Sequence, residues 1–397
     1  MKGVFYMNNG EKKMERSLRW GMIGGGRTSQ VGYKHRSGAL RDRTYELVAG
    51  AFDIDSERGK SFGVNLGVDK NRCYDDYQTL IEEEAKRTDG VEVVSIATPN
   101  GTHYEITMAA LEAGLHVICE KPLVFTTKEA EEIKAFAEQQ GLIVGVTYGY
   151  SGNSIILQMR SMIEQNKIGD IHLVEMQYTH GYAGNSQGDK DNAAQKWRVD
   201  PKIAGPTFVI GDLSIHTYYI SKLVLPHLSI KKLLCDRQSF VGSRYPLEDN
   251  AYVLMHYDNG AVGRMWTSAV DSGQMDGQRI RIVGSTGSLE WWDSAPNELL
   301  YQPQGAPNQT LYRGAEYLDD LAKQNERLGI LHQEGLTEAW GNIYLNIALA
   351  IDAKNRGDEE TLSQLIYPDI NSGIEGVRWI ENCVASADQG SQWVEYQ

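Results

Sequence analysis

Short apolar runs alternate with helix-compatible segments along the first 150 residues. Runs of about four to eight apolar residues closed by glycine or polar residues are typical of buried strands. They predict strands at residues 18–24, 45–52, 91–97, 115–119 and 142–147. The segments between them predict helices that end near Leu40 and that span residues 75–82, 102–113 and 126–140. Because strands alternating with helices form right-handed crossovers, we expect an α/β domain with a doubly wound parallel sheet.

The pattern changes after Tyr150. A helix is predicted at residues 153–166, and residues 171–178 alternate like a half-exposed strand. Further strands are predicted at residues 229–240, 250–257, 261–269, 279–283 and 288–292, and helices at residues 206–224, 335–354 and 368–385. Residues 294–333 are expected to be irregular. Successive short strands predict a largely antiparallel open sheet, with one face free to pack on helices or on another subunit.

These patterns divide the chain into three parts. Residues 1–16 form a polar N-terminal extension, residues 17–149 an α/β domain and residues 150–397 an α+β domain. Two domains agree with a length of 397 residues, which is too long for one simple core. The extension lacks the apolar segment of a secretory signal peptide.

Composition narrows the class of protein. An apolar content of 41% and a charged content of 23% are those of a soluble globular protein, and no run of about 18 apolar residues predicts a membrane span. The four cysteines lack CxxC spacing, which indicates neither disulfides nor a zinc site and favours a reducing cytoplasm. The net charge of −14 disfavours nucleic acid and membrane partners, because both select a basic surface.

A glycine-rich turn follows the first predicted strand, with the sequence Gly24-Gly25-Gly26-Arg27-Thr28-Ser29. The glycines permit a tight turn and a close approach of the backbone to a pyrophosphate, while the next helix supplies N-terminal amides. Ser29 stands where a third glycine or alanine is usual, which predicts slightly looser packing of helix on strand. The order strand, turn and helix predicts a dinucleotide-binding Rossmann domain.

Asp53 ends the second predicted strand, farther from the glycines than the usual spacing of about 20 residues. An inserted loop at residues 38–44 accounts for the difference. A carboxylate at this position accepts hydrogen bonds from an adenosine ribose and repels a 2′-phosphate, which favours NAD over NADP. The other interpretation is that Asp53, together with Asp55 and Ser56, caps the following helix, and the two interpretations are compatible.

Two further predicted strands end in polar residues. Thr98-Pro99-Asn100 and Glu120-Lys121-Pro122 follow strands whose carboxyl ends should lie on the same edge as the glycine-rich turn, where α/β sheets bind ligands. A lysine partly withdrawn from water loses its charge readily and can assist proton transfer, whereas the simpler interpretation is a solvated surface turn. His103 is either polar filler at a helix start or a residue of the cofactor cleft.

The second domain carries one comparable feature, within its predicted helix at residues 206–224. Asp212 and His216 are four residues apart and therefore lie on one helical face. This spacing is compatible with a surface ion pair, a pair of metal ligands or a catalytic pair. No third ligand or HExxH-type neighbour supports a metal, so we expect no metal site. A neutral histidine, with an ordinary pKa of about 6.5, can accept a proton near pH 7.

The motifs resemble those of the glucose–fructose oxidoreductase/inositol dehydrogenase (Gfo/Idh/MocA) family over roughly residues 17–390. The most specific match is Glu120-Lys121-Pro122, and the glycine-rich turn and Thr98-Pro99-Asn100 with His103 also match. The resemblance implies an enzyme that binds NAD, with NADP the less favoured cofactor. The residues expected to bind the cofactor are Gly24, Gly26, Arg27, Thr28, Ser29, Asp53, Thr98, Pro99, Asn100, His103, Glu120 and Lys121.

The resemblance also implies catalytic roles. Lys121 would bind substrate near the nicotinamide and help to move the proton, and the Lys121–Pro122 peptide bond would be cis. His216 would act as general base on the substrate hydroxyl, and Asp212 would contact the substrate or orient His216. Ser214 replaces a glycine of the family motif and is expected to narrow the pocket. The expected reaction oxidises a secondary hydroxyl of a sugar or cyclitol to a ketone, as hydride passes to the nicotinamide.

A long polar loop at residues 179–205 offers groups for a hydroxylated substrate: Tyr182, Asn185, Gln187, Asp189, Asp191, Lys196, Trp197, Arg198 and Asp200. Its W-R-x-D-P element resembles a subgroup similar to scyllo-inositol and L-glucose dehydrogenases, whereas residues 178–182 depart from that subgroup. The expected substrate-binding residues are Lys121, Tyr182, Trp197, Arg198, Asp212 and His216. A homodimer or homotetramer through the second domain's sheet is the expected assembly.

Two other functions stay open from the sequence. Some relatives hydrolyse glycosides while retaining NAD, and a non-catalytic NAD-binding sensor would share the fold. The joint presence of Lys121, Asp212 and His216 favours an enzyme over a sensor. Trp291 and Trp292 either pack within the sheet or form a platform for a sugar.

Overall fold

A computed structural model describes residues 13–184 and 196–397, which form two compact units. One unit contains residues 13–149 and 340–377, and the other contains residues 150–184, 196–339 and 378–397. Residues 340–377 were expected in the second domain but belong to the first unit. The reason is aromatic packing: the rings of Trp340 and Tyr344 lie 4.9 and 5.9 Å from the ring of His35.

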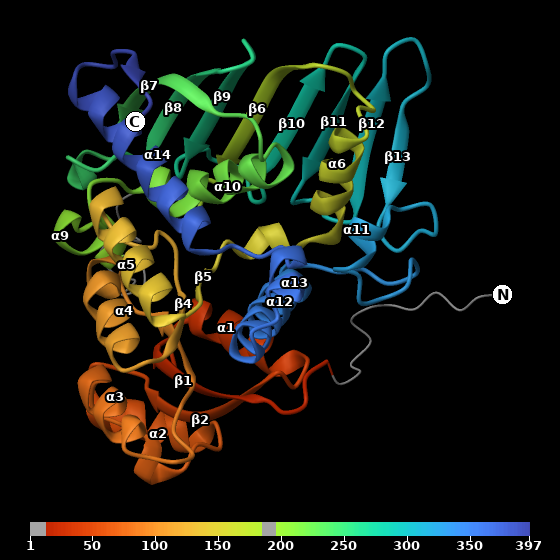
Figure 1. Ribbon diagram of the computed structural model, residues 1–397. Coiled ribbons are helices and arrows are strands. Elements are labelled where there is room, and N and C mark those ends of the chain that lie inside the picture. Colours follow the sequence, from red (N-terminus) through yellow and green to blue (C-terminus); the bar gives the residue numbers. More distant parts are fainter. Residues whose placement is uncertain (1–12, 185–195) are drawn as a thin grey trace. The chain divides into compact units, whose positions relative to one another are not determined.

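The first unit contains a five-stranded sheet in the order β2-β1-β3-β4-β5, and all its strand pairs are parallel. The strands are β1 Leu18–Gly24, β2 Tyr45–Ala51, β3 Val93–Ala97, β4 His116–Cys119 and β5 Val144–Val146. The helices are α1 Gln30–Arg41, α2 Ser56–Asn65, α3 Tyr77–Ala85, α4 His103–Glu112, α5 Thr127–Gln140, most of α12 Leu336–Arg356, and α13 Glu359–Gln364. In Figure 1, α4 and α5 cover one face of this sheet and α1 and α12 the other. The expected doubly wound parallel sheet is confirmed.

Local sequence signals set the ends of these helices. Thr126 and Glu129 form a capping box at the start of α5, and Gly141 ends that helix in the left-handed conformation, with φ 68°. Asp76 caps α3 by accepting a hydrogen bond from the amide of Thr79. Such caps explain why the predicted boundaries agree with the observed ones within a few residues.

Gly32 gives α1 its close packing on the glycine-rich turn. A Cβ at Gly32 would lie 2.1 Å from the carbonyl oxygen of Gly25, so only glycine fits there. Ser29 has a different role, because its hydroxyl caps α1 by accepting a hydrogen bond from the amide of Gly32. The looser packing expected from Ser29 is therefore not observed, since the close approach lies three residues farther along the helix.

The second unit contains a nine-stranded sheet in the order β13-β12-β11-β10-β6-β9-β8-β7-β14. Only the β6–β9 pair is parallel, so the expected largely antiparallel sheet is confirmed. Its strands are β6 Ile171–Thr179, β7 Ile230–Gln238, β8 Asn250–Tyr257, β9 Val262–Ser268, β10 Arg279–Gly284, β11 Gly287–Trp292, β12 Glu298–Pro303, β13 Gln309–Tyr312 and β14 Val394–Glu395.

Helices cover one face of the nine-stranded sheet (Figure 1). They are α6 Ser154–Glu164, α10 Ile215–Val224 and the later part of α14 Ile370–Asp388. The same unit also contains the short helices α9 Pro201–Ala204 and α11 Asp320–Lys323. Tyr218 of α10 stacks on Trp379 of α14 with ring centroids 4.7 Å apart. Trp291 is buried and donates to the carbonyl of Pro296, which favours sheet packing over a sugar platform for this side chain.

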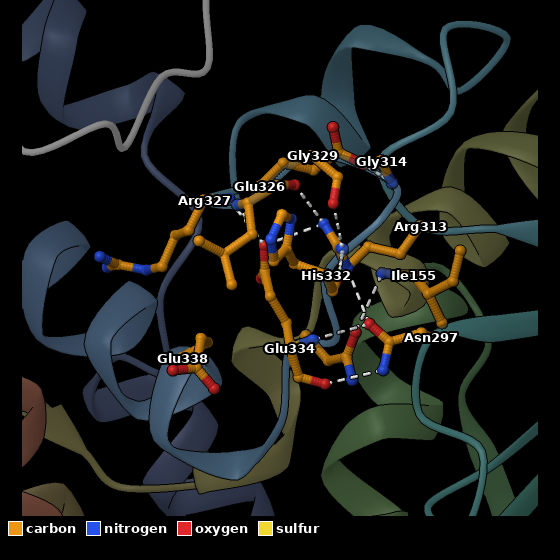
Figure 2. Close-up of polar contacts among 12 residues, drawn as sticks. Ile155, Asn297, Arg313, Gly314, Glu326, Arg327, Gly329, His332, Glu334 and Glu338 are labelled. Atoms are coloured by element: carbon orange, nitrogen blue, oxygen red, sulfur yellow. Dashed lines mark hydrogen bonds and ion pairs between the residues drawn. The ribbon is translucent and has the colours of Figure 1, made fainter.

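Residues 294–333 are more ordered than expected, since they contain β12, β13 and α11. Figure 2 shows a buried polar cluster that organises this segment around Arg313. The Arg313 guanidinium donates to Oδ1 of Asn297 at 2.7 Å and pairs with Oε1 of Glu334 at 3.0 Å. The same Glu334 oxygen accepts the amides of Arg327 and Leu328. β13 was missed because its residues are mostly exposed and show no apolar alternation, whereas β12 carries a short apolar run that the prediction overlooked.

The four cysteines are buried and none forms a disulfide. They are Cys73, Cys119, Cys235 and Cys383. Among the helices of the described residues, none combines the length and the apolar character needed to cross a membrane.

Candidate active site

Three strand ends of the first unit meet at one edge of its sheet. Gly24 and Gly25 have φ values of 76° and 67°, and the Gly25 amide donates to the carbonyl of Ala97 at the end of β3. The amide of Glu120, at the end of β4, donates to the carbonyl of Ile96. The structure thus brings together the three motifs that the sequence placed at strand ends.

Asp53 lies against the glycine-rich turn. A Cβ at Gly26 would lie 2.6 Å from the carbonyl oxygen of Phe52 and 3.1 Å from a carboxylate oxygen of Asp53. Arg58 donates to both oxygens of Asp53, at 2.7 and 2.5 Å, and these bonds lower the pKa of the Asp53 carboxyl. The cap of α2 is Asp55, which accepts the amide of Arg58. Asp53 also accepts the amide of Asp55 at 3.1 Å, so its carboxylate is tied to the start of α2 as well as lying beside the turn, and its proposed contact with a ribose stays a prediction.

The glycine-rich turn fits a dinucleotide. A side chain at Gly26 would clash with the carbonyl oxygen of Phe52, so the turn packs closely on the end of β2, and α1 begins four residues later with its first amides near the turn. Arg27 and Thr28 are exposed, and the Arg27 guanidinium lies 5.4 Å from the centre of the Phe62 ring. A pyrophosphate could therefore approach the backbone between Gly24 and Ser29.

Glu120 is buried in a hydrogen-bonded network rather than exposed at the sheet edge. Its Oε1 lies 3.1 Å from Nε2 of His35 and accepts the Thr147 hydroxyl, while Oε2 accepts the amide of Lys121 at 3.3 Å. Burial raises the pKa of Glu120, but His35, the charge of Lys121 and the Thr147 hydroxyl outweigh it and lower the pKa to about 2. Glu120 therefore stays ionised and anchors the backbone of Lys121.

His103 joins two of the strand-end motifs. It is fully buried, with Nδ1 2.9 Å from the carbonyl oxygen of Pro122 and Nε2 3.0 Å from that of Thr98. Burial lowers the pKa of this imidazole. The Lys121–Pro122 peptide bond is cis, as the resemblance implies. Pro99 and Asn100 are partly exposed beside these residues, as is Lys121.

The helix that carries Asp212 and His216 begins with a π-helical turn, Ile210–Ser214, and continues as α10. It starts about four residues later than expected, after Pro206. Between residues 207 and 221, only Asp212 and His216 are partly exposed and every other residue is buried. A buried helix that presents one acid and one imidazole on the same side is typical of a functional site, and π turns are frequent at such sites.

Ser214 is fully buried, and its hydroxyl donates to the carbonyl of Ile210 at 2.8 Å. A serine that bonds back to the fourth preceding carbonyl competes with the regular helix ladder. The Ser214 side chain therefore forms a hydrogen bond within the π turn and does not project into a pocket, in contrast to the expectation that it would narrow one.

Two tyrosines surround His216. The ring of Tyr150 meets the imidazole edge-on at 5.1 Å, and the ring of Tyr178 lies 6.3 Å away. Their hydroxyls are 2.6 Å apart. Burial raises the pKa of both tyrosines, and the charges of Asp293 and Asp212 add to this effect. Both phenols therefore stay protonated and can donate hydrogen bonds.

Arg198 and Trp197 also belong to this group of residues. Nε of Arg198 lies 3.3 Å from Oδ2 of Asp212, and its guanidinium lies 4.5 Å from the centre of the Trp197 ring. Trp197 packs on an apolar cluster that includes Phe208 and Leu213. Tyr182 is 71% exposed. Asn185, Gln187, Asp189 and Asp191 lie outside the described residues.

Sequence reasoning missed several neighbours of Asp212. They are Tyr150, Tyr178 and His180, and Asp293 in turn acts on the two tyrosines. Burial lowers the pKa of His180, whereas the charge of Asp212 raises it. Tyr178, His180 and Asp293 each lie at or just after the end of a strand, and this position is the signal that could have identified them.

Family comparisons cover both units. Residues 18–148 match the NAD-binding Rossmann fold of an oxidoreductase family (GFO_IDH_MocA), and residues 160–396 match the C-terminal alpha/beta domain of the same family. The uncharacterized oxidoreductase YfiI of Bacillus subtilis is 70% identical over 98% of this chain and 100% of its own length.

Solved structures agree with this assignment. The structure of an inositol dehydrogenase homolog from Azotobacter vinelandii complexed with NAD+ is 56% identical, with a TM-score of 0.96 over 98% of this chain and 100% of that one. Its complex with NADH and myo-inositol has a TM-score of 0.94 at 55% identity, with the same coverage. The chain therefore belongs to the Gfo/Idh/MocA family of NAD-binding oxidoreductases.

Proposed function

We propose that this protein is an NAD-dependent dehydrogenase that oxidises a secondary hydroxyl of a sugar or cyclitol to a ketone. The observation that carries the proposal is the pair Asp212 and His216, the only partly exposed residues between 207 and 221. The myo-inositol bound to the Azotobacter vinelandii homolog supports an inositol-like substrate.

NAD, held at the glycine-rich turn, would supply the acceptor for the hydride that leaves the carbon carrying the hydroxyl. Neutral His216 accepts the hydroxyl proton on its imidazole, and the edge-on ring of Tyr150 and the tilted ring of Tyr178 orient its ring. Lys121 donates a hydrogen bond to the same oxygen as negative charge develops there. Asp212, paired with Arg198, contacts the substrate or orients His216. Tyr182 and Trp197 complete the proposed substrate site.

The proposed cofactor site uses the edge of the parallel sheet. The glycine-rich turn from Gly24 to Ser29 would bind the pyrophosphate, and Asp53 the adenosine ribose. Thr98, Pro99 and Asn100 would lie beside the nicotinamide half. Because Glu120 and His103 are buried, we assign them an indirect role through Lys121 and Pro122.

The cofactor preference should depend on Asp53. In Asp53→Ser the negative charge is removed and Arg58 keeps only its longer contact with Asp55, at 3.7 Å, so a 2′-phosphate becomes acceptable. We expect the ratio of kcat/KM with NAD to kcat/KM with NADP to fall at least tenfold, which is about 1.4 kcal/mol. Asp75→Ser is the control, since exposed Asp75 pairs with Lys60 at 2.8 Å. A wild-type enzyme that strongly prefers NADP would contradict the assignment.

Activity on a panel of polyols tests the proposed reaction. The panel contains inositol isomers, D- and L-hexoses and anhydro-sugars, and absorbance at 340 nm is followed with NAD and with NADP. We expect stoichiometric NADH with at least one member of the panel. Phenol released from an aryl glycoside without added NAD would instead indicate a hydrolase, and a flat response to all compounds would indicate a sensor.

We further propose that two or four copies assemble through the nine-stranded sheet. Its face opposite the helices exposes Leu173, Tyr252, Leu254 and Val262, on neighbouring strands β6, β8 and β9. An apolar surface of this kind is typical of an interface between subunits. Light scattering should give at least twice the mass of one chain, and Leu254→Asp should lower that mass.

We also propose a reducing cytoplasm as the location of the protein, because its four cysteines are buried and free.

A further inference from the structure

Glu248 is a buried acid whose two oxygens have different surroundings. Glu248 is only 1% exposed and lies just before β8 in the sequence. Oε1 accepts the amides of Phe208 and Ile210, each at 2.9 Å. Oε2 is buried and has no hydrogen-bond partner among the described residues. Buried polar atoms are rarely left in this state, so this carboxyl has a structural or functional reason to be there.

The two amides belong to the start of the helix that carries Asp212 and His216. The first amides of a helix have no acceptor within the helix, and they are usually satisfied by a nearby side chain. Here the acceptor comes from a residue 40 positions away in the sequence for Phe208 and 38 for Ile210. The start of this helix therefore depends on a tertiary contact.

The residue at which this helix starts decides on which side of the helix Asp212 lies. The π turn begins at Ile210, and the amide of Asp212 donates to the carbonyl of Phe208 at 2.8 Å. One residue corresponds to about 100° of rotation in a helix, because a turn contains about 3.6 residues. A shift of the first turn by one residue would thus turn Asp212 away from the side that His216 occupies.

We propose that Glu248 is a positioning residue, which fixes the start of the π turn and thereby holds Asp212 and His216 on one side of the helix. It acts through the backbone of Phe208 and Ile210 and does not contact substrate. The proposal rests on the proposed function only in the assignment of Asp212 and His216 as catalytic residues.

The surroundings of Glu248 indicate that its carboxyl acts as a hydrogen-bond acceptor for the two amides and not as the partner of a cation. Burial raises its pKa to about 7, although the charge of Arg237 on β7 lowers it. Arg237 is itself paired with Asp388 of α14, and the charge of Glu248 also acts on the buried thiol of Cys383 in α14. Next to Glu248 in the sequence, Asp249 pairs with buried Arg244. A neutral acceptor should therefore replace this acid well.

Three variants separate positioning from simple stability. Glu248→Met removes both acceptors, Glu248→Gln keeps one neutral acceptor, and Glu248→Asp keeps the charge on a side chain one methylene shorter. Glu326→Gln is the matched control, because Glu326 is equally buried and accepts the amide of Gly314 at 2.6 Å in the cluster of Figure 2.

Turnover is the first measurement. We expect kcat to fall at least tenfold in Glu248→Met and at least threefold in Glu248→Asp, while the dissociation constant for NAD stays within twofold. Glu248→Gln should keep kcat within threefold of wild type, and so should Glu326→Gln. Wild-type kcat in folded Glu248→Met, or in Glu248→Asp if the methionine variant does not fold, would overturn the proposal.

A second measurement does not require turnover. Diethylpyrocarbonate modifies accessible imidazoles, and mass spectrometry gives the rate at His216 with exposed His227 as internal reference. We expect the rate at His216 relative to His227 to change at least threefold in Glu248→Met or Glu248→Asp, and to stay unchanged in Glu248→Gln. An unchanged ratio in the first two variants overturns the positioning role. A changed ratio in a protein that oxidises no polyol supports the positioning role and overturns only the proposed dehydrogenase.

The pH dependence of stability gives an independent check of the carboxyl. A folded-state pKa near 7, raised from an ordinary value near 4.5, means that Glu248 contributes stability fully below pH 4.5 and loses it as pH rises through about 7. The unfolding midpoint of the wild type should therefore fall relative to Glu248→Gln between pH 5 and pH 8. A constant difference over this range would contradict the buried position of the acid.

Discussion

Replacing His216 with alanine should lower kcat at least a hundredfold while NAD still binds. A positioned general base contributes about 10²–10⁴ in rate, and His216 is the imidazole that shares a helical side with Asp212. The dissociation constant for NAD should stay within threefold of wild type, because the glycine-rich turn and Asp53 belong to the other unit. Steady-state kinetics on an active polyol and a fluorescence titration with NAD measure the two quantities.

The control for this substitution is His227→Ala, which removes an exposed imidazole just after α10. Its turnover should equal that of the wild type. If His216→Ala also turned over at a near-normal rate, the assignment of His216 as general base would be wrong. A loss of NAD binding in His216→Ala would indicate misfolding rather than a missing base, and circular dichroism would detect it.

Replacing Glu120 with alanine should lower the free energy of unfolding by about 3 kcal/mol, because a buried charge network loses its acid. His35 Nε2 and the Thr147 hydroxyl would each lose their contact with Oε1, and the Lys121 amide would lose its contact with Oε2. Because Lys121 is then less well fixed, kcat should also fall. Urea denaturation and steady-state kinetics measure these effects.

The pH dependence of the Glu120 effect follows from its low pKa. A folded-state pKa of about 2, below the ordinary value near 4.5, means that the ionised carboxyl stabilises the protein above pH 4.5. This contribution is lost as pH falls through about 2, so the difference between wild type and Glu120→Ala should shrink on acidification. The control is Glu138→Ala, which breaks only an exposed pair with Lys134 at 3.8 Å. An equal loss in the free energy of unfolding for both variants would show that Glu120 is not a buried anchor.

The sheet edge of the first unit was predictable because two simple regularities combine. Apolar runs identify the strands, and parallel neighbours end at the same edge of a sheet. Gly24, Thr98 and Glu120 therefore came together as expected, and so did Asp212 and His216 on one helical side. Each of these predictions needs only local spacing and a rule of topology.

Other features of the site depend on distances that no local pattern contains. Gly32 of α1 packs so closely on the turn that a Cβ at Gly32 would lie 2.1 Å from the carbonyl oxygen of Gly25. Tyr150 and Tyr178 meet at His216 although 28 residues separate the two tyrosines. The π turn at Ile210–Ser214 has no sequence signature of its own, and it depends on contacts such as the one with Glu248.

The sequence by itself determined the two folds, the strand ends at which the polar motifs lie and the membership in an oxidoreductase family. It did so because periodicity and motif spacing are properties of neighbouring residues. Only the tertiary structure decided which polar residues are buried anchors and which face outward. Glu120, His103 and Glu248 are buried, whereas Lys121, Asp212 and His216 are partly exposed. The burial and pairing of a charge depend on segments that are distant in the chain, and spacing along the sequence does not record them.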